Sequence, residues 1–254
     1  MTDTTAPELA GSTRGRVAVI AGTIAVVAIP LMSLGRYAGL WSPVFAIPAL
    51  LANVITLFAA LLAIILGLIG LMTRRGRAWS AYPVRSSLVA LVLGLVMIGT
   101  IVAYSAGRTK YPQIHDVTTD TDNPPKFVAL QAERNAMRAP NTTAYNPAVA
   151  AKQKQGFPDL GPKILPLPAA EAFKRALDAA QAMGWRIAAA EPSEGRIEAV
   201  ATTFWAGFID DVVIRVTPMG DNQSRVDVRS ESRVGGGDMG ANGMRIEKFL
   251  AKLQ

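Results

Sequence analysis

The chain has 254 residues, half of them hydrophobic, with 26 basic and 19 acidic residues and a formal net charge of +7. It contains no cysteine, which excludes disulfide bonds and thiol chemistry. The charge is unevenly distributed: residues 1–106 hold seven basic and two acidic residues, whereas residues 107–254 hold nineteen and seventeen. Because the second part has no concentrated basic surface, the composition argues against a nucleic-acid partner.

Three uncharged apolar segments follow the N-terminal tail 1–16, at Val17–Leu34, Val44–Met72 and Leu88–Tyr104. A helix that spans a bilayer needs about 20 mostly apolar residues, so we predict a membrane domain at 17–106 with three transmembrane helices. The first segment is too long for a signal peptide, whose apolar core has about 7–15 residues, and no clear cleavage site follows it. We therefore expect an uncleaved anchor in the lipid bilayer.

Basic residues near the spans predict the orientation. Arg14, Arg16 and four arginines at 74–85 would lie on one side, against Arg36, Arg108 and Lys110 on the other. The bias places the N-terminus in the cytoplasm and the C-terminal part outside. In a bacterium with two membranes, the chain would be a multi-pass inner-membrane protein with a periplasmic domain.

Residues 107–162 are rich in proline and polar residues, which favour extended loops. We expect a tether there, with a short helix possible at Phe127–Arg138. The rest either drapes over the following domain or spans the gap to it.

From residue 163 the hydrophobic pattern becomes regular and predicts the order β-α-β-β-β-β-α. This order is typical of an antiparallel sheet with helices on one face, an α+β fold. A chain that starts near Gln155 should then fold by itself. The expected elements are Ile164–Leu167, Ala169–Met183, Trp185–Ala190, Arg196–Thr203, Asp211–Thr217, Arg225–Val234 and Met239–Leu253.

Several short runs in this part are specific in combination. They are Phe157-Pro158-Asp159-Leu160, Met183-Gly184-Trp185, Gly195-Arg196-Ile197-Glu198-Ala199, Asp210-Asp211-Val212-Val213-Ile214-Arg215-Val216, Val226-Asp227-Val228-Arg229-Ser230 and Ser232-Arg233-Val234-Gly235 with Asp238, preceded by His115-Asp116-Val117-Thr118-Thr119-Asp120 and Asn123-Pro124-Pro125-Lys126-Phe127. With them, residues 111–254 resemble the domain-of-unknown-function family DUF1499, in a membrane-anchored form. The resemblance implies a bacterial envelope or membrane-associated domain without an established activity. Gly236-Gly237 stand where Arg-Ser is more usual, which weakens any anion-binding role for that loop.

Residues that could carry catalysis or bind a metal are sparse. His115-Asp116 could support acid–base chemistry, but it lies in the tether without a nearby nucleophile. Asp116, Asp120 and Asp122 suggest calcium, yet the glycine and glutamate of a calcium-binding loop are missing, and prolines interrupt the segment. We therefore expect no catalytic residue, metal or cofactor here.

A candidate polar cluster comprises Asp211, Asp238, Asn242 and Arg245. Strand alternation points Asp210 and Asp211 to opposite faces. The glycine run 235–237 precedes a helix and could hold an anion. Asp238 would occupy the anion position if it caps that helix, and Asn242 is expected to make a structural hydrogen bond.

The strand 225–234 alternates charged residues with Val and Ser, which predicts a solvated charged face. A sharper interpretation makes this face a partner surface beside an aromatic loop, because interfaces favour arginine and aromatic side chains. The candidate partner surface comprises Trp205, Arg215, Arg229 and Arg233.

These observations favour a non-catalytic envelope module that binds a protein, a lipid or a cell-wall component. The alternative is a hydrolase-like enzyme that acts on an anionic envelope substrate through Asp211 or Asp238, and whether the chain is an enzyme stays open. Convergence of Asp211, Arg229, Arg233 and Asp238 on one concave pocket would favour the enzyme.

Overall fold

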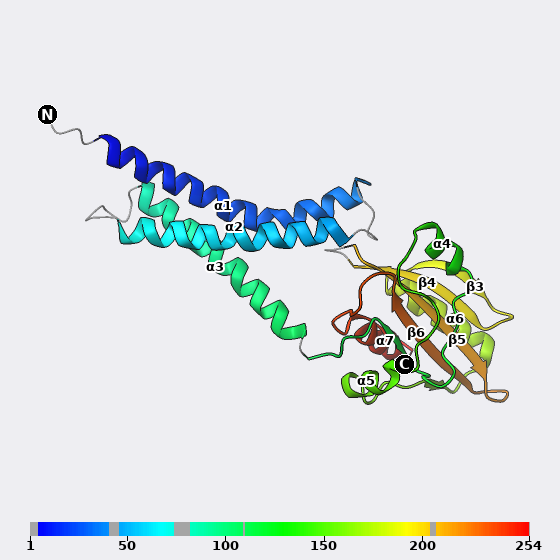
Figure 1. The fold of residues 1–254 in the computed structure, drawn as a ribbon. Coiled ribbons are helices and arrows are strands. Elements are labelled where there is room, and N and C mark those ends of the chain that lie inside the picture. The colour runs from blue at the N-terminus through cyan, green and yellow to red at the C-terminus, as the bar shows by residue number, and fades with distance from the viewer. Residues whose placement is uncertain (1–4, 41–45, 74–81, 109, 204–206, 254) are drawn as a thin grey trace. The chain divides into compact units, whose positions relative to one another are not determined.

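The computed structural model describes residues 5–40, 46–73, 82–108, 110–203 and 207–253. The chain divides into two compact units, Met1–Ala106 and Gly107–Gln254 (Figure 1).

The first unit is built from three long helices, α1 (Thr5–Tyr37), α2 (Ala46–Met72) and α3 (Tyr82–Arg108). Each contains a stretch that is long and apolar enough to cross a membrane. These stretches are Thr13–Gly35, Leu51–Met72 and Val84–Ala106. The three predicted apolar helices are therefore confirmed as candidate membrane spans.

Small residues line the contacts between these helices. Ala18, Ala21, Ala63 and Ala90 form a buried cluster, and a Cβ atom at Gly94 would lie only 2.8 Å from the carbonyl oxygen of Ala60. Close helix approach through small side chains is typical of association in membranes, where hydrophobic burial cannot drive packing.

The second unit contains a six-stranded antiparallel sheet with the order β1-β6-β5-β4-β3, and β2 also pairs with β6. The predicted α+β class is confirmed. The strands are β1 (Asp116–Thr118), β2 (Lys163–Leu165), β3 (Arg186–Glu191), β4 (Arg196–Thr202), β5 (Ile209–Pro218) and β6 (Ser224–Ser232).

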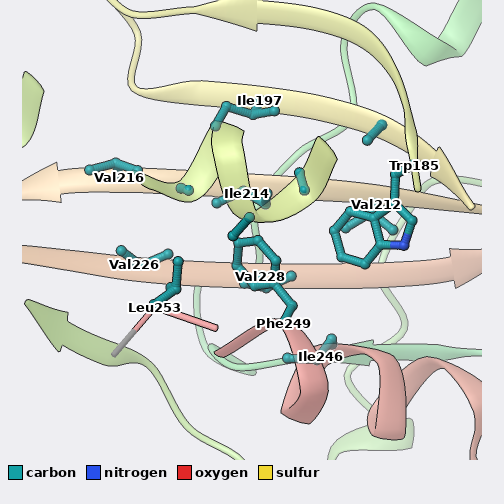
Figure 2. Packing of buried hydrophobic residues seen from close by; sticks show 14 of the residues in the cluster. Trp185, Ile197, Val212, Ile214, Val216, Val226, Val228, Ile246, Phe249 and Leu253 are labelled. Atoms are coloured by element: carbon teal, nitrogen blue, oxygen red, sulfur yellow. The ribbon is translucent and has the colours of Figure 1, made fainter. Parts of the chain in front are cut away.

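One face of the sheet packs against α6 (Ala169–Ala182) and α7 (Ala241–Ala251). Figure 2 shows this core, in which the Trp185 and Phe249 rings stack with 5.4 Å between centroids. The valines of β6 point into this core, as the alternating pattern predicts. Helix α7 begins two residues later than expected, because Met239 and Gly240 both have positive φ.

The proline-rich segment packs on the sheet. Of the two expected arrangements, it therefore drapes over the domain. Strand β1 pairs with β6, and the Gln153 side chain on α5 (Val149–Gly156) bonds both backbone groups of Thr118. Helix α4 (Leu130–Ala136) corresponds to the short helix expected at Phe127–Arg138. Neither β1 nor α5 was predicted, because β1 is three residues long and α5 is mostly polar.

Candidate functional site

The charged residues of β6 lie on the second face of the sheet, and the structure corrects the expectation that this face is solvated. Arg229, Glu231 and Arg233 are each 1% exposed or less. Residues 116–145 cover them with β1, with irregular chain and with α4, which Figure 1 shows beside the sheet. Asp116, Glu133 and Arg134 of this segment supply the opposite charges. The face therefore forms a buried ion-pair network rather than a surface.

Arg229 is held on several sides within this network. Its guanidinium donates to both carboxylate oxygens of Asp116 at 2.9 and 2.8 Å. The Phe127 and Tyr145 rings lie at 5.1 and 5.5 Å from its guanidinium carbon, within range of cation–π attraction. Burial and the Asp116 charge raise the pKa of Tyr145 to about 12, so this ring stays neutral.

Asp211 joins two further arginines on the same face. Arg134 from α4 donates to its Oδ2 at 2.6 Å, and Arg233 donates to its Oδ1 at 2.7 Å. Arg233 also bonds the Glu133 carboxylate at 3.0 Å. Burial raises the pKa of Glu133, but hydrogen bonds from Arg186 and Arg233 outweigh it and leave that pKa below its usual value.

A second group in the network surrounds Asp227, which is fully buried. Arg215 and Arg225 each bond both Asp227 and Asp120. Burial opposes ionisation of Asp120, yet the Asn123 N–H and the two arginines lower its pKa overall. Arg215, a member of the candidate partner surface, is thus an internal ion-pair partner whose side chain is only partly exposed.

Glu198 on β4 caps helix α4 from another part of the chain. Its carboxylate accepts the N–H groups of Val128, Ala129 and Leu130 at 2.9–3.0 Å. The first N–H groups of a helix have no partner within the helix, and the helix dipole favours negative charge there. The sequence analysis missed this contact because Glu198 lies about 70 residues after the helix that it caps. The only signal in the sequence was a glutamate on the face of β4 that alternation assigns away from the core.

Glu231 is the least satisfied member of the network. Its Oε1 accepts from Arg134 at 3.0 Å, whereas its Oε2 has no hydrogen bond and lies 3.5 Å from Arg229. Burial is the main cause that raises the pKa of Glu231 to about 8. The Asp116 and Asp211 charges add to this, and Arg134 and Arg229 oppose it. The carboxyl is therefore mainly protonated at neutral pH.

This raised pKa predicts a stability that falls as pH rises. A neutral Glu231 costs little to bury. Its contribution to the free energy of unfolding is therefore complete below about pH 4.5 and is lost as pH rises through about 8. One group can change the free energy of unfolding by at most about 1.4 kcal/mol per pH unit. Urea unfolding of the full-length protein in detergent, followed by circular dichroism between pH 5 and 8, should show this slope.

Glu231→Gln is the matched variant, because the amide has the size of the protonated carboxyl and does not titrate. We expect it to flatten the slope and to be more stable than the natural chain at pH 8. Asp238, whose pKa burial also raises, contributes with the same sign. An unchanged slope in Glu231→Gln would show that Glu231 is ionised in the fold.

The predicted polar cluster is only partly assembled, and Asp211 is the member that does not belong. Arg245 bonds Asp210, Asn242 and Ser230 on the face covered by α7, whereas Asp211 points to the opposite face. The predicted divergence of Asp210 and Asp211 is thus confirmed, and Asp210 takes the place expected for Asp211.

The remaining members of the cluster are structural. Asn242 bonds Ser230, Ser232 and the His115 carbonyl, which confirms its predicted hydrogen-bonding role. Asp238 accepts the N–H groups of Gly240 and Asn242, at the position where an anion would bind. It lies two residues before the formal cap, Gly240.

The remaining candidates from the sequence are the possible calcium ligands and Trp205. Asp116 and Asp120, considered with Asp122 for calcium, pair with arginines. Among the described residues no group of three His, Cys, Asp or Glu side chains could hold a metal ion. Trp205 lies outside the described residues.

Two open grooves on the described surface touch the network only at Arg215. One follows α6 and is lined by Glu171, Lys174, Arg175 and Asp178 among others. The second lies beside the N-terminus of α6, and of the candidate residues it includes Arg215. Asp211, Arg229, Arg233 and Asp238 line neither groove.

Among the comparisons with known proteins, a family model matches the part of the chain that contains the ion-pair network. No curated protein and no solved structure matches the chain. The model of the family described as "Protein of unknown function (DUF1499)" matches residues 116–253, which include β1, α4 and the whole sheet. The chain therefore belongs to the DUF1499 family, with three candidate membrane helices ahead of the family domain.

Proposed function

We propose that the protein is a membrane-anchored, extracytoplasmic interaction module of the bacterial envelope without catalytic activity. The observation that carries this proposal is the internal use of its charged residues. Asp211, Arg229 and Arg233 are buried in mutual ion pairs. They stabilise the fold, and neither of the two grooves described above includes any of them.

The hydrolase-like alternative loses its basis in the same geometry. Asp211 faces α4 and Asp238 faces α7, so the sheet separates them. Each carboxylate accepts hydrogen bonds from protein groups, and neither groove described above contains them. No observation in the described residues favours an anionic envelope substrate.

The surface we propose for a protein partner is the outer edge of β3. This strand pairs only with β4, so one row of its backbone groups has no partner strand in the described sheet. An extended peptide can add a strand to such an edge. The register shift between Ile187 and Ala189 interrupts the edge and limits unspecific pairing.

Reporter fusions test the proposed topology. A reporter active only outside the cytoplasm should be active after Gln254 and within residues 41–45, and silent within residues 74–81. The reason is the excess of arginine at 14–16 and 74–85, which retains those segments inside. The reverse pattern would place the family domain in the cytoplasm and overturn the proposal.

Photocrosslinking in intact membranes tests the interaction role. A photoreactive residue at the exposed Ala188 on β3 should give an adduct of discrete mass, whereas one at the exposed Ala182 on α6 serves as the matched control. The edge is rejected as the partner surface if Ala188 gives no adduct, or if both positions give the same set.

A further inference from the structure

We propose that the family domain docks on the bilayer that holds its helices, through a lysine patch formed by Lys110, Lys152 and Lys154. Its partner is the layer of anionic phospholipid headgroups. This inference rests on the proposed membrane anchoring and adds a second point of contact to it.

The chain length between the two units limits how far the patch can move from the membrane. The third candidate span ends at Ala106. Tyr111 is already fixed in the family domain, because its ring stacks on Phe157 with 5.2 Å between centroids, and a Cβ atom at Gly240 would lie 2.6 Å from it. Five residues reach at most about 18 Å when fully extended.

The patch is built on a rigid support. Helix α5 is fixed by the buried Gln153, whose amide bonds Thr118, and by Val149, which packs against the core. The end of α5 contacts the entering chain, since a Cβ atom at Gly156 would lie 2.4 Å from Pro112. Lysines on α5 therefore keep a constant position relative to the point where the chain enters the domain.

The charge of the patch is available to an external partner. Lys110, Lys152 and Lys154 are exposed, and none takes part in the ion pairs of the described residues. The Lys110 ammonium lies over the Tyr111 ring, 5.8 Å from its centroid, and stays exposed there. In this respect they differ from the arginines of β6, which are all paired. Asp159 is the exposed acidic residue that follows α5 in sequence, so the local balance stays positive.

The character of the patch favours headgroups over insertion into the bilayer. The exposed residues of α5 are Ala151, Lys152, Lys154 and Gln155, without a large apolar side chain. Clustered lysines close to a membrane are attracted by anionic lipids over roughly a Debye length, about 8 Å at physiological salt. The connection to α3, at most about 18 Å long when fully extended, is short enough for the patch to approach this field.

Lysine acetylation of the full-length protein in nanodiscs tests this docking. A water-soluble reagent is applied in discs of zwitterionic lipid and in discs that also contain anionic lipid, and the rate at each lysine is read by mass spectrometry. Lys110, Lys152 and Lys154 should react at least about threefold more slowly with anionic lipid and recover in high salt. The exposed Lys126 and Lys174 are internal controls and should not change.

A variant and two controls separate the possible outcomes. Lys152→Gln together with Lys154→Gln should remove the protection of Lys110. Equal rates in both kinds of disc, with the protein still eluting with lipid, would overturn docking and leave anchoring intact. Protection by inorganic phosphate in zwitterionic discs would assign the patch to a free anion and overturn docking, and failure to elute with lipid would overturn both.

Discussion

Replacing Arg229 with alanine is expected to destabilise the family domain by about 3–5 kcal/mol, the cost of removing one partner from a buried ion pair. The change leaves the buried Asp116 carboxylate without its bidentate partner and opens a space between the Phe127 and Tyr145 rings. Urea unfolding in detergent, followed by circular dichroism, measures the loss.

Arg186→Ala is the matched control for this prediction. Arg186 also pairs with a glutamate, but its side chain is 56% exposed, so its removal should cost no more than about 1 kcal/mol. A double variant with Arg229→Met and Asp116→Leu should recover part of the loss, because no unpaired charge stays buried. Equal effects of Arg229→Ala and Arg186→Ala would contradict the buried network.

Removing the covering segment is the second change with a large expected effect. A fragment of residues 155–254 should not fold cooperatively, whereas residues 107–254 should. The shorter fragment lacks β1, α4 and the core residues Ile114 and Val117. It also leaves the charged face of β6 without Asp116 and Arg134. These losses together are large compared with the stability of about 5–15 kcal/mol that a domain commonly has.

Near-ultraviolet circular dichroism and thermal melting of the two fragments decide this point. The sequence pattern, which becomes regular only at residue 163, predicted that a chain starting near Gln155 would fold alone. A cooperative transition in the 155–254 fragment would restore that earlier interpretation. It would also show that the covering segment adds little to the fold.

Both predictions follow from the way the two faces of the sheet are covered. The face toward α6 and α7 is covered by apolar packing, in which loss of one contact is shared among many neighbours. The other face combines a small apolar cluster of Phe127, Leu130, Val200 and Val213 with buried ion pairs, in which loss of one charge leaves another charge buried. The second face should therefore be the more sensitive to single substitutions of polar residues.

The amino-acid sequence by itself determined the three apolar helices, the order of elements from β2 to α7, and the residues that share each face of β6. These features depend on local periodicity: about 20 uncharged residues for a span and alternation for a strand. The same alternation correctly separated Asp210 from Asp211.

Only the tertiary structure decided what covers the charged face of the sheet. Alternation places Arg229 and Arg233 together on one side, but it does not distinguish a solvated face from one covered by another segment. The partner of Arg229 is Asp116, 113 residues earlier in the chain, and the residues around Asp116 show no regular period. Pairing between charges so distant in sequence leaves no local pattern. The burial of this face, which the sequence predicted to be solvated, can therefore be seen only in the folded structure.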